Sequence, residues 1–185
     1  MDKNLGQREK IILNLTKQQK TKIWIKTLLY SYKYFPNLIK TVDKIIEMRA
    51  STISFSSDIF NSKRNENQFE HIIDLGERKK NLLNIYVMIT NFFDFLSVEL
   101  KDIAHKKFIE KWTNEKLSDS LNVSIRTIYR KTTKVIDEIY SGMKKNNWSL
   151  ELIELQVKDE QWLFERYKHY ENEFIYSSDN SKKEI

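Results

Sequence analysis

The sequence predicts an all-α protein, a helical bundle built around one long central helix. Three observations lead to this class. Apolar residues recur at helical spacing along most of the chain. Only three glycines and one proline occur among 185 residues, which disfavours β-sandwiches and their many tight turns. Hydrophobic residues make up 40% and charged residues 31%, so the chain has enough apolar surface for a packed core.

The N-terminal half is expected to contain two helical regions joined by a linker. Residues 1–50 form a basic helical region, in which Pro36 suits the first turn of a second helix. Residues 51–67 are rich in Ser and Asn and lack apolar periodicity, which predicts a loop or linker. Residues 68–96 are predicted to form the long connecting helix, which Gly76 could bend.

The C-terminal half is expected to contain two further helical regions and a tail. Residues 97–145 form one predicted domain of several helices. Residues 146–176 form an acidic, aromatic helical segment, and residues 177–185 form a disordered tail. The apolar stripe of this segment favours core packing or a partner-helix surface over a cofactor site, and it consists of Leu163, Tyr167, Tyr170 and Phe174.

Residues 113–135 have the spacing of two helices joined by a tight turn. Thr113 caps a two-turn helix, Asn122 suits a left-handed turn position, and Ser124 caps the next helix. The predicted core of this motif consists of Leu117, Ser118, Leu121, Asn122, Val123, Ile128 and Val135. This is the helix-turn-helix pattern, in which the second helix enters the major groove of DNA.

The solvent face of the second helix is basic. Residues 124–134 contain four basic side chains and no acidic one. Early residues of such a helix reach base edges, so the predicted base contacts are Arg126, Thr127, Arg130 and Thr133. The predicted phosphate contacts are Ser124, Lys116, Lys131 and Lys134.

Charge is distributed unevenly along the rest of the chain, whose formal net charge is +6. Residues 1–50 hold 11 basic and 4 acidic side chains, whereas residues 151–185 hold 5 basic and 9 acidic ones. The 25 lysines against 7 arginines are typical of an AT-rich genome, so total charge alone is weak support for a polyanionic partner.

Residues 97–140 resemble region 4 of bacterial sigma factors, and resemble still more the phage and mobile-element activators of the ArpU and RinA type. The resemblance covers about a quarter of the chain. The matching features are a helix that precedes the motif, the cap Thr113, the turn Leu121-Asn122-Val123-Ser124 and the helix start Arg126-Thr127-Ile128-Tyr129-Arg130. Ser118 stands where alanine is usual in these proteins. The resemblance implies a sigma-like DNA-binding unit from a phage or mobile element of a low-GC bacterium.

We therefore expect a sequence-specific, double-stranded-DNA-binding transcriptional regulator that contacts RNA polymerase at promoters. Three alternatives stay open: an alternative sigma factor, a small-terminase-like DNA-packaging adaptor of a phage, and a helical protein-interaction module. No nucleophilic serine elbow, phosphate-binding loop or catalytic carboxylate cluster is visible, so we expect no enzyme.

Composition also indicates compartment and partners. The chain has no cysteine, which excludes disulfides and thiolate zinc sites and favours a reducing cytoplasm. The longest uncharged run is too short for a membrane span. We expect a cytoplasmic, nucleoid-associated protein with no cofactor, metal or membrane partner, and a homo-oligomer stays open.

Overall fold

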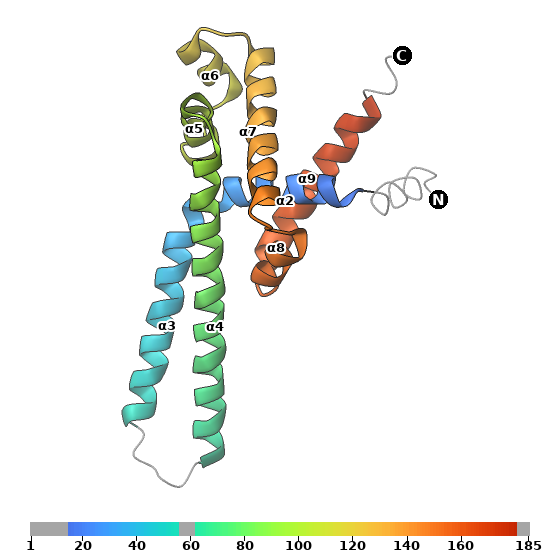
Figure 1. The fold of residues 1–185 in the computed structure, drawn as a ribbon. Helices are drawn as coiled ribbons and strands as arrows, with labels where there is room; N and C mark the ends of the chain where they lie inside the picture. The colour runs from blue at the N-terminus through green and yellow to red at the C-terminus, as the bar shows by residue number, and fades with distance from the viewer. Residues whose placement is uncertain (1–14, 56–61, 181–185) are drawn as a thin grey trace, which may run out of the picture.

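The computed structural model describes residues 15–55 and 62–180, and every regular element in these ranges is helical (Figure 1). The predicted all-α class is therefore confirmed. In chain order the elements are α2 (Lys17–Ser31), the 3-10 turn η1 (Tyr32–Tyr34), α3 (Phe35–Phe55), α4 (Ser62–Phe92), the 3-10 turn η2 (Phe93–Phe95), α5 (Val98–Ala104), the π-helical turn η3 (His105–Ile109), α6 (Asn114–Leu121), α7 (Ile125–Lys145), α8 (Leu150–Val157) and α9 (Gln161–Asn180).

Helix α2 lies at the centre of the molecule, where α7, α8 and α9 pack against it. Trp24 and Leu28 are buried in the core. Tyr167 of α9 packs on Trp24 with ring centroids 4.5 Å apart, and Tyr170 stacks on Tyr30 at 5.3 Å. The aromatic stripe of α9 thus packs on α2, which confirms its core-packing interpretation.

Helices α3 and α4 form an antiparallel hairpin that extends away from the other helices (Figure 1). The predicted loop over 51–67 is wrong at both ends, because α3 continues to Phe55 and α4 begins at Ser62. The hydroxyls of Ser51 and Thr52 each donate to the carbonyl of Met48 at 2.8 Å, so these polar side chains bond within the helix instead of ending it. Residues 56–61 lie outside the described residues.

Helix α4 continues through Gly76 without a break. Two other elements differ from the sequence-based expectation. The predicted domain over 97–145 begins with α5, which continues into the π-helical turn η3, and Lys111 then takes a left-handed backbone with φ 62°. Helix α9 runs to Asn180, so the predicted disordered tail is wrong for 177–180, while 181–185 lie outside the described residues.

A buried carboxylate connects α4 to the α8–α9 junction. Glu160 is 1% exposed and accepts hydrogen bonds from Arg78 of α4 at 2.7 and 3.1 Å and from the Trp162 indole at 2.8 Å. One cluster of buried residues includes members of α2, α4, α5, α7, α8 and α9, so the helices share one core. Among the described residues, no helix is both long and apolar enough to cross a bilayer.

Candidate nucleic-acid interface

Helices α6 and α7 meet at a three-residue corner with the predicted caps. The Thr113 hydroxyl accepts a hydrogen bond from the Lys116 backbone N–H at 3.2 Å, which starts α6. Asn122 ends α6 in the left-handed region, with φ 49° and ψ 47°. The Ser124 hydroxyl then accepts from the Thr127 N–H at 3.2 Å and starts α7. The two helices and their turn are therefore present as the sequence predicts.

Of the predicted core residues of this motif, Asn122 is exposed at the turn, and the others are buried or half-buried. Leu117, Ile128 and Val135 are fully buried, and Leu121 is half-buried against the cluster of buried residues that includes Val135. Val123 is half-buried at the corner. The Ser118 hydroxyl donates to the Val123 carbonyl, so the serine that replaces the usual alanine satisfies a backbone acceptor of the turn.

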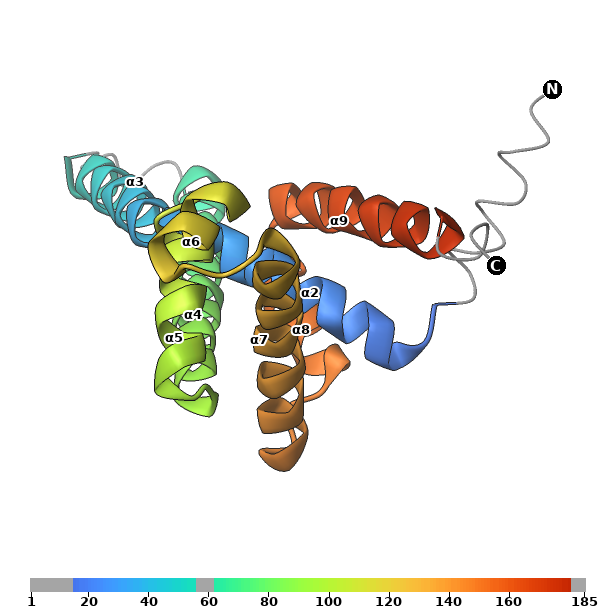
Figure 2. The same ribbon diagram turned by 90° about the horizontal axis from the view of Figure 1, so that it is seen from above.

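Arg126 and Arg130 are exposed on the side of α7 that faces away from its buried residues. Within 15–55 and 62–180, no ion pair of the structure engages either guanidinium. Lys134 is exposed on the same side and lies 3.7 Å from Glu138, one helical turn later. Figure 1 shows the start of α7 at one end of the molecule, and Figure 2 looks onto that end.

The two predicted threonine contacts already make intramolecular hydrogen bonds. The Thr127 hydroxyl lies 2.9 Å from the Ser124 hydroxyl within the cap of α7. The Thr133 hydroxyl donates to the Tyr129 carbonyl at 3.1 Å. The Thr133 hydroxyl can still accept a hydrogen bond from a base. To donate one, it would have to give up its bond to Tyr129.

The predicted phosphate contacts differ in their surroundings. Lys131 pairs with Glu99 of α5, and this bond lowers the pKa of the Glu99 carboxyl. Lys131 would have to exchange that carboxylate for a phosphate. The Lys116 ammonium lies 3.9 Å from the centroid of the Trp112 ring, at the start of α6. The Ser124 hydroxyl belongs to the cap, and the Lys134 side chain is 65% exposed.

A groove of about 430 Å³ lies between α2, α7 and α9, next to the basic face. Its walls include Tyr30, Tyr129, Ile136, Tyr170 and Phe174. Lys107 also lines it and donates to the Asn114 side chain at 2.6 Å, and burial lowers the pKa of this ammonium. Sequence reasoning missed the groove because its walls come from three distant segments, although the aromatic stripe of α9 was a signal.

A second half-buried lysine, Lys111, follows the π-helical turn η3. Lys111 donates to the Tyr30 carbonyl at 2.6 Å. Burial, together with Lys33 and Arg166 nearby, lowers the pKa of Lys111 to about 8. Within the described part of the chain, no three His, Cys, Asp or Glu side chains are close enough together to hold a metal ion.

Comparisons with protein-family models, with curated proteins and with solved structures found no match to this chain.

Proposed function

We propose that this chain is a sequence-specific, double-stranded-DNA-binding protein in which α7 enters the major groove. The observation that carries the proposal is the pair Arg126 and Arg130, exposed on the first turns of α7 and free of ion pairs within the described residues. An arginine can donate two parallel hydrogen bonds to the major-groove edge of guanine. Positions in the first turns of the second helix are those that reach base edges in helix-turn-helix proteins.

The surroundings of these arginines suit a polyanion. The first turn of α7 contains no acidic residue, and its helix dipole adds partial positive charge at that end. Lys116 and Lys134 lie on either side of the corner and can contact phosphates of the DNA backbone. Phosphate contacts would supply affinity, while Arg126, Thr127, Arg130 and Thr133 would select the sequence.

The biological role that fits best is transcription regulation, in which the bound protein contacts RNA polymerase at a promoter. It rests on the resemblance of residues 97–140 to sigma-like activators. An alternative sigma factor would start transcription with core polymerase and no other sigma, whereas an activator would not. A packaging adaptor would form a large ring with a correspondingly high native mass.

Selection from a random duplex library tests DNA binding directly. The purified chain should enrich one sequence motif, and the affinity for the enriched duplex should fall linearly on a log–log plot as salt is raised. The slope should be about −0.9 for each phosphate contact. A helical protein-interaction module would enrich no motif and show no such dependence, and that result would reject the proposal.

A further inference from the structure

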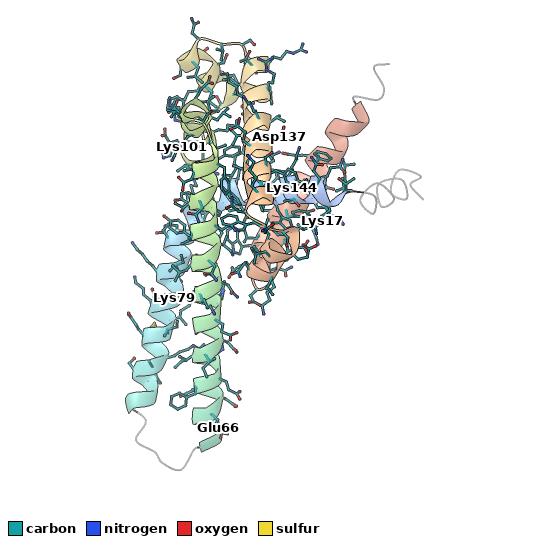
Figure 3. All side chains as sticks on the ribbon, in the orientation of Figure 1. Lys17, Glu66, Lys79, Lys101, Asp137 and Lys144 are labelled. Atoms are coloured by element: carbon teal, nitrogen blue, oxygen red, sulfur yellow. The ribbon has the colours of Figure 1, made fainter. Side chains whose placement is uncertain are left out.

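Helix α4 carries an apolar stripe that no other described element covers. Phe69, Ile73, Leu83 and Val87 are 54%, 62%, 40% and 54% exposed. They lie on one face of the helix, together with Gly76 and Lys80, at alternating steps of four and three residues. This is the spacing of a coiled-coil seam, and it lies on the projecting hairpin, where Figure 3 labels Glu66 and Lys79.

The order of residues along this seam is symmetrical about Arg78. Phe69 and Val87 are each nine residues from this point, Ile73 and Leu83 are each five, and Gly76 and Lys80 are each two. A second α4 that runs antiparallel about a two-fold axis therefore places Phe69 opposite Val87, and Ile73 opposite Leu83. Such a contact is isologous, with one surface used twice.

The polar residues near the centre are complementary in the same register. Glu77 and Lys80 are exposed, and among the described residues no ion pair engages either one. In the antiparallel pairing, Glu77 of each copy lies next to Lys80 of the other. Gly76 has no atom within 4 Å of its Cβ position, so it leaves room for the opposing lysine.

Helix α3 extends the same surface. Asp43 pairs with Lys79 of α4, so the flank of α3 that carries Asp43 lies at the level of the two-fold axis. Lys40 and Glu47 are exposed on that flank, three residues before and four residues after Asp43. The axis that relates the two α4 helices therefore brings Lys40 of one copy near Glu47 of the other.

We propose that two copies of this chain associate through the seam Phe69–Ile73–Gly76–Lys80–Leu83–Val87, so that their α3–α4 hairpins form an antiparallel four-helix bundle. A contact about 27 Å long and two helices wide covers roughly 540 Å² on each copy, or about 1,100 Å² in total, which exceeds the ~1,000 Å² expected of a specific interface. The proposal does not depend on DNA binding. If both hold, the dimer presents two α7 helices to one duplex.

Cysteine cross-linking tests the register, because the native chain has no cysteine. An equimolar mixture of the Phe69→Cys and Val87→Cys proteins should form disulfide-linked dimers on oxidation. Each variant alone should form few, since two copies of the same position lie ~27 Å apart in the antiparallel pairing, beyond the ~7 Å between Cα atoms that a disulfide spans. Equal cross-linking of Phe69→Cys alone, or none in the mixture, would overturn the proposed register.

The native mass tests the dimer itself. Sedimentation equilibrium should give twice the 22.4 kDa of one chain. Ile73→Glu should give the monomer mass, whereas Met48→Glu, a matched change of an exposed apolar residue on α3, should leave the dimer intact. If the native chain still has the monomer mass at ~100 μM, its dissociation constant is higher than that of an ordinary specific dimer, and the proposal is rejected.

A charge exchange separates loss of the interface from loss of folding. Glu77→Lys alone and Lys80→Glu alone should each weaken the dimer about tenfold, because each creates like-charge pairs across the axis. The double variant Glu77→Lys/Lys80→Glu should restore most of the affinity. If the loss of dimer affinity in the double variant equals the product of the two single losses, the two side chains do not meet across the interface and the register is wrong.

Discussion

At the scale of single residues, Asn122 fixes the angle between α6 and α7. Its backbone is left-handed, a conformation in which a Cβ-branched residue clashes and asparagine or glycine is tolerated. The Asn122 side chain itself is exposed. The cost of a substitution here is therefore a backbone cost.

The first prediction concerns this position. Asn122→Val should lower the free energy of unfolding by about 1–2 kcal/mol, and Asn122→Gly should change it by only a few tenths. Urea denaturation followed by circular dichroism measures both. Equal losses for the two variants would show that the side chain, and not the left-handed backbone, matters at the corner.

Lys111 gives the chain a predictable pH dependence. Its pKa is about 8 in the folded protein, against 10.5 for an unperturbed lysine, so between these values the unfolded chain holds a proton that the folded chain has released. Stability must then rise with pH in this window. Above about pH 10 the tyrosines act in the opposite sense, because burial raises the pKa of Tyr170 to about 12.

The second prediction follows from this sign. Denaturation midpoints of the native chain should rise from pH 7.5 to pH 9.5 more steeply than those of Lys111→Met. The separation between the two curves should change steadily across this window, because the folded native chain releases a proton that its unfolded form keeps. A constant separation between them would mean that proton release from Lys111 does not contribute.

At the scale of elements, α7 packs closely against η2 through a glycine. A Cβ atom built on Gly142 would clash with the side chain of Phe95. The clash includes the Cβ of Phe95, which rotation of the ring cannot move away, and the ring itself packs on Trp148 with centroids 5.8 Å apart. Helix α7 can approach η2 this closely only because position 142 lacks a side chain.

Gly142→Ala should therefore destabilise the protein by about 1–3 kcal/mol through overpacking, despite the higher helix propensity of alanine. The neighbouring change Ser141→Ala, on the exposed side of α7, should stay within ~0.5 kcal/mol. Thermal or urea denaturation of the pair measures the difference. If Gly142→Ala is neutral, the packing of α7 on η2 is looser than described.

Local signals account for what the sequence predicted well. Thr113, Asn122 and Ser124 each act on backbone groups within a few residues, so the bounds of α6 and the start of α7 could be predicted from the pattern alone. The helical ends at 51–55 and 62–67 could not, because polar side chains that are typical of loops also bond within helices. The Lys131–Glu99 ion pair could not be predicted either, because it depends on the packing of α5 on α7, which no local sequence pattern shows.

At the scale of the whole molecule, the basic N-terminal block and the acidic C-terminal block of the sequence make direct contact. Basic residues of α2 pair with acidic residues of the C-terminal helices, as in Lys17–Glu151 and Lys26–Glu173. Two basic side chains of the N-terminal block are thus engaged by the acidic end of the chain. Arg126 and Arg130 keep their charge available, which the sequence suggested from local placement but could not show.

The fourth prediction concerns the link between the hairpin and the rest of the molecule. Arg78→Ala removes both donors that α4 supplies to the buried Glu160 carboxylate, and should cost about 2–3 kcal/mol. Adding Glu160→Gln to that variant should recover part of the loss, since the uncompensated buried charge is then gone. No recovery in the double variant would show that the pair acts through packing and not through charge.

The central claim is that α7 reads DNA sequence through Arg126. The most direct measurement compares the affinities of the native chain and Arg126→Ala for the selected duplex and for a random one at the same salt. The variant should lose about 1–3 kcal/mol on the selected duplex and much less on the random one. Lys144→Ala, which removes a cation from the opposite end of α7, should leave this specificity unchanged (Figure 3). Equal losses of Arg126→Ala on both duplexes, or no loss on either, would contradict the account.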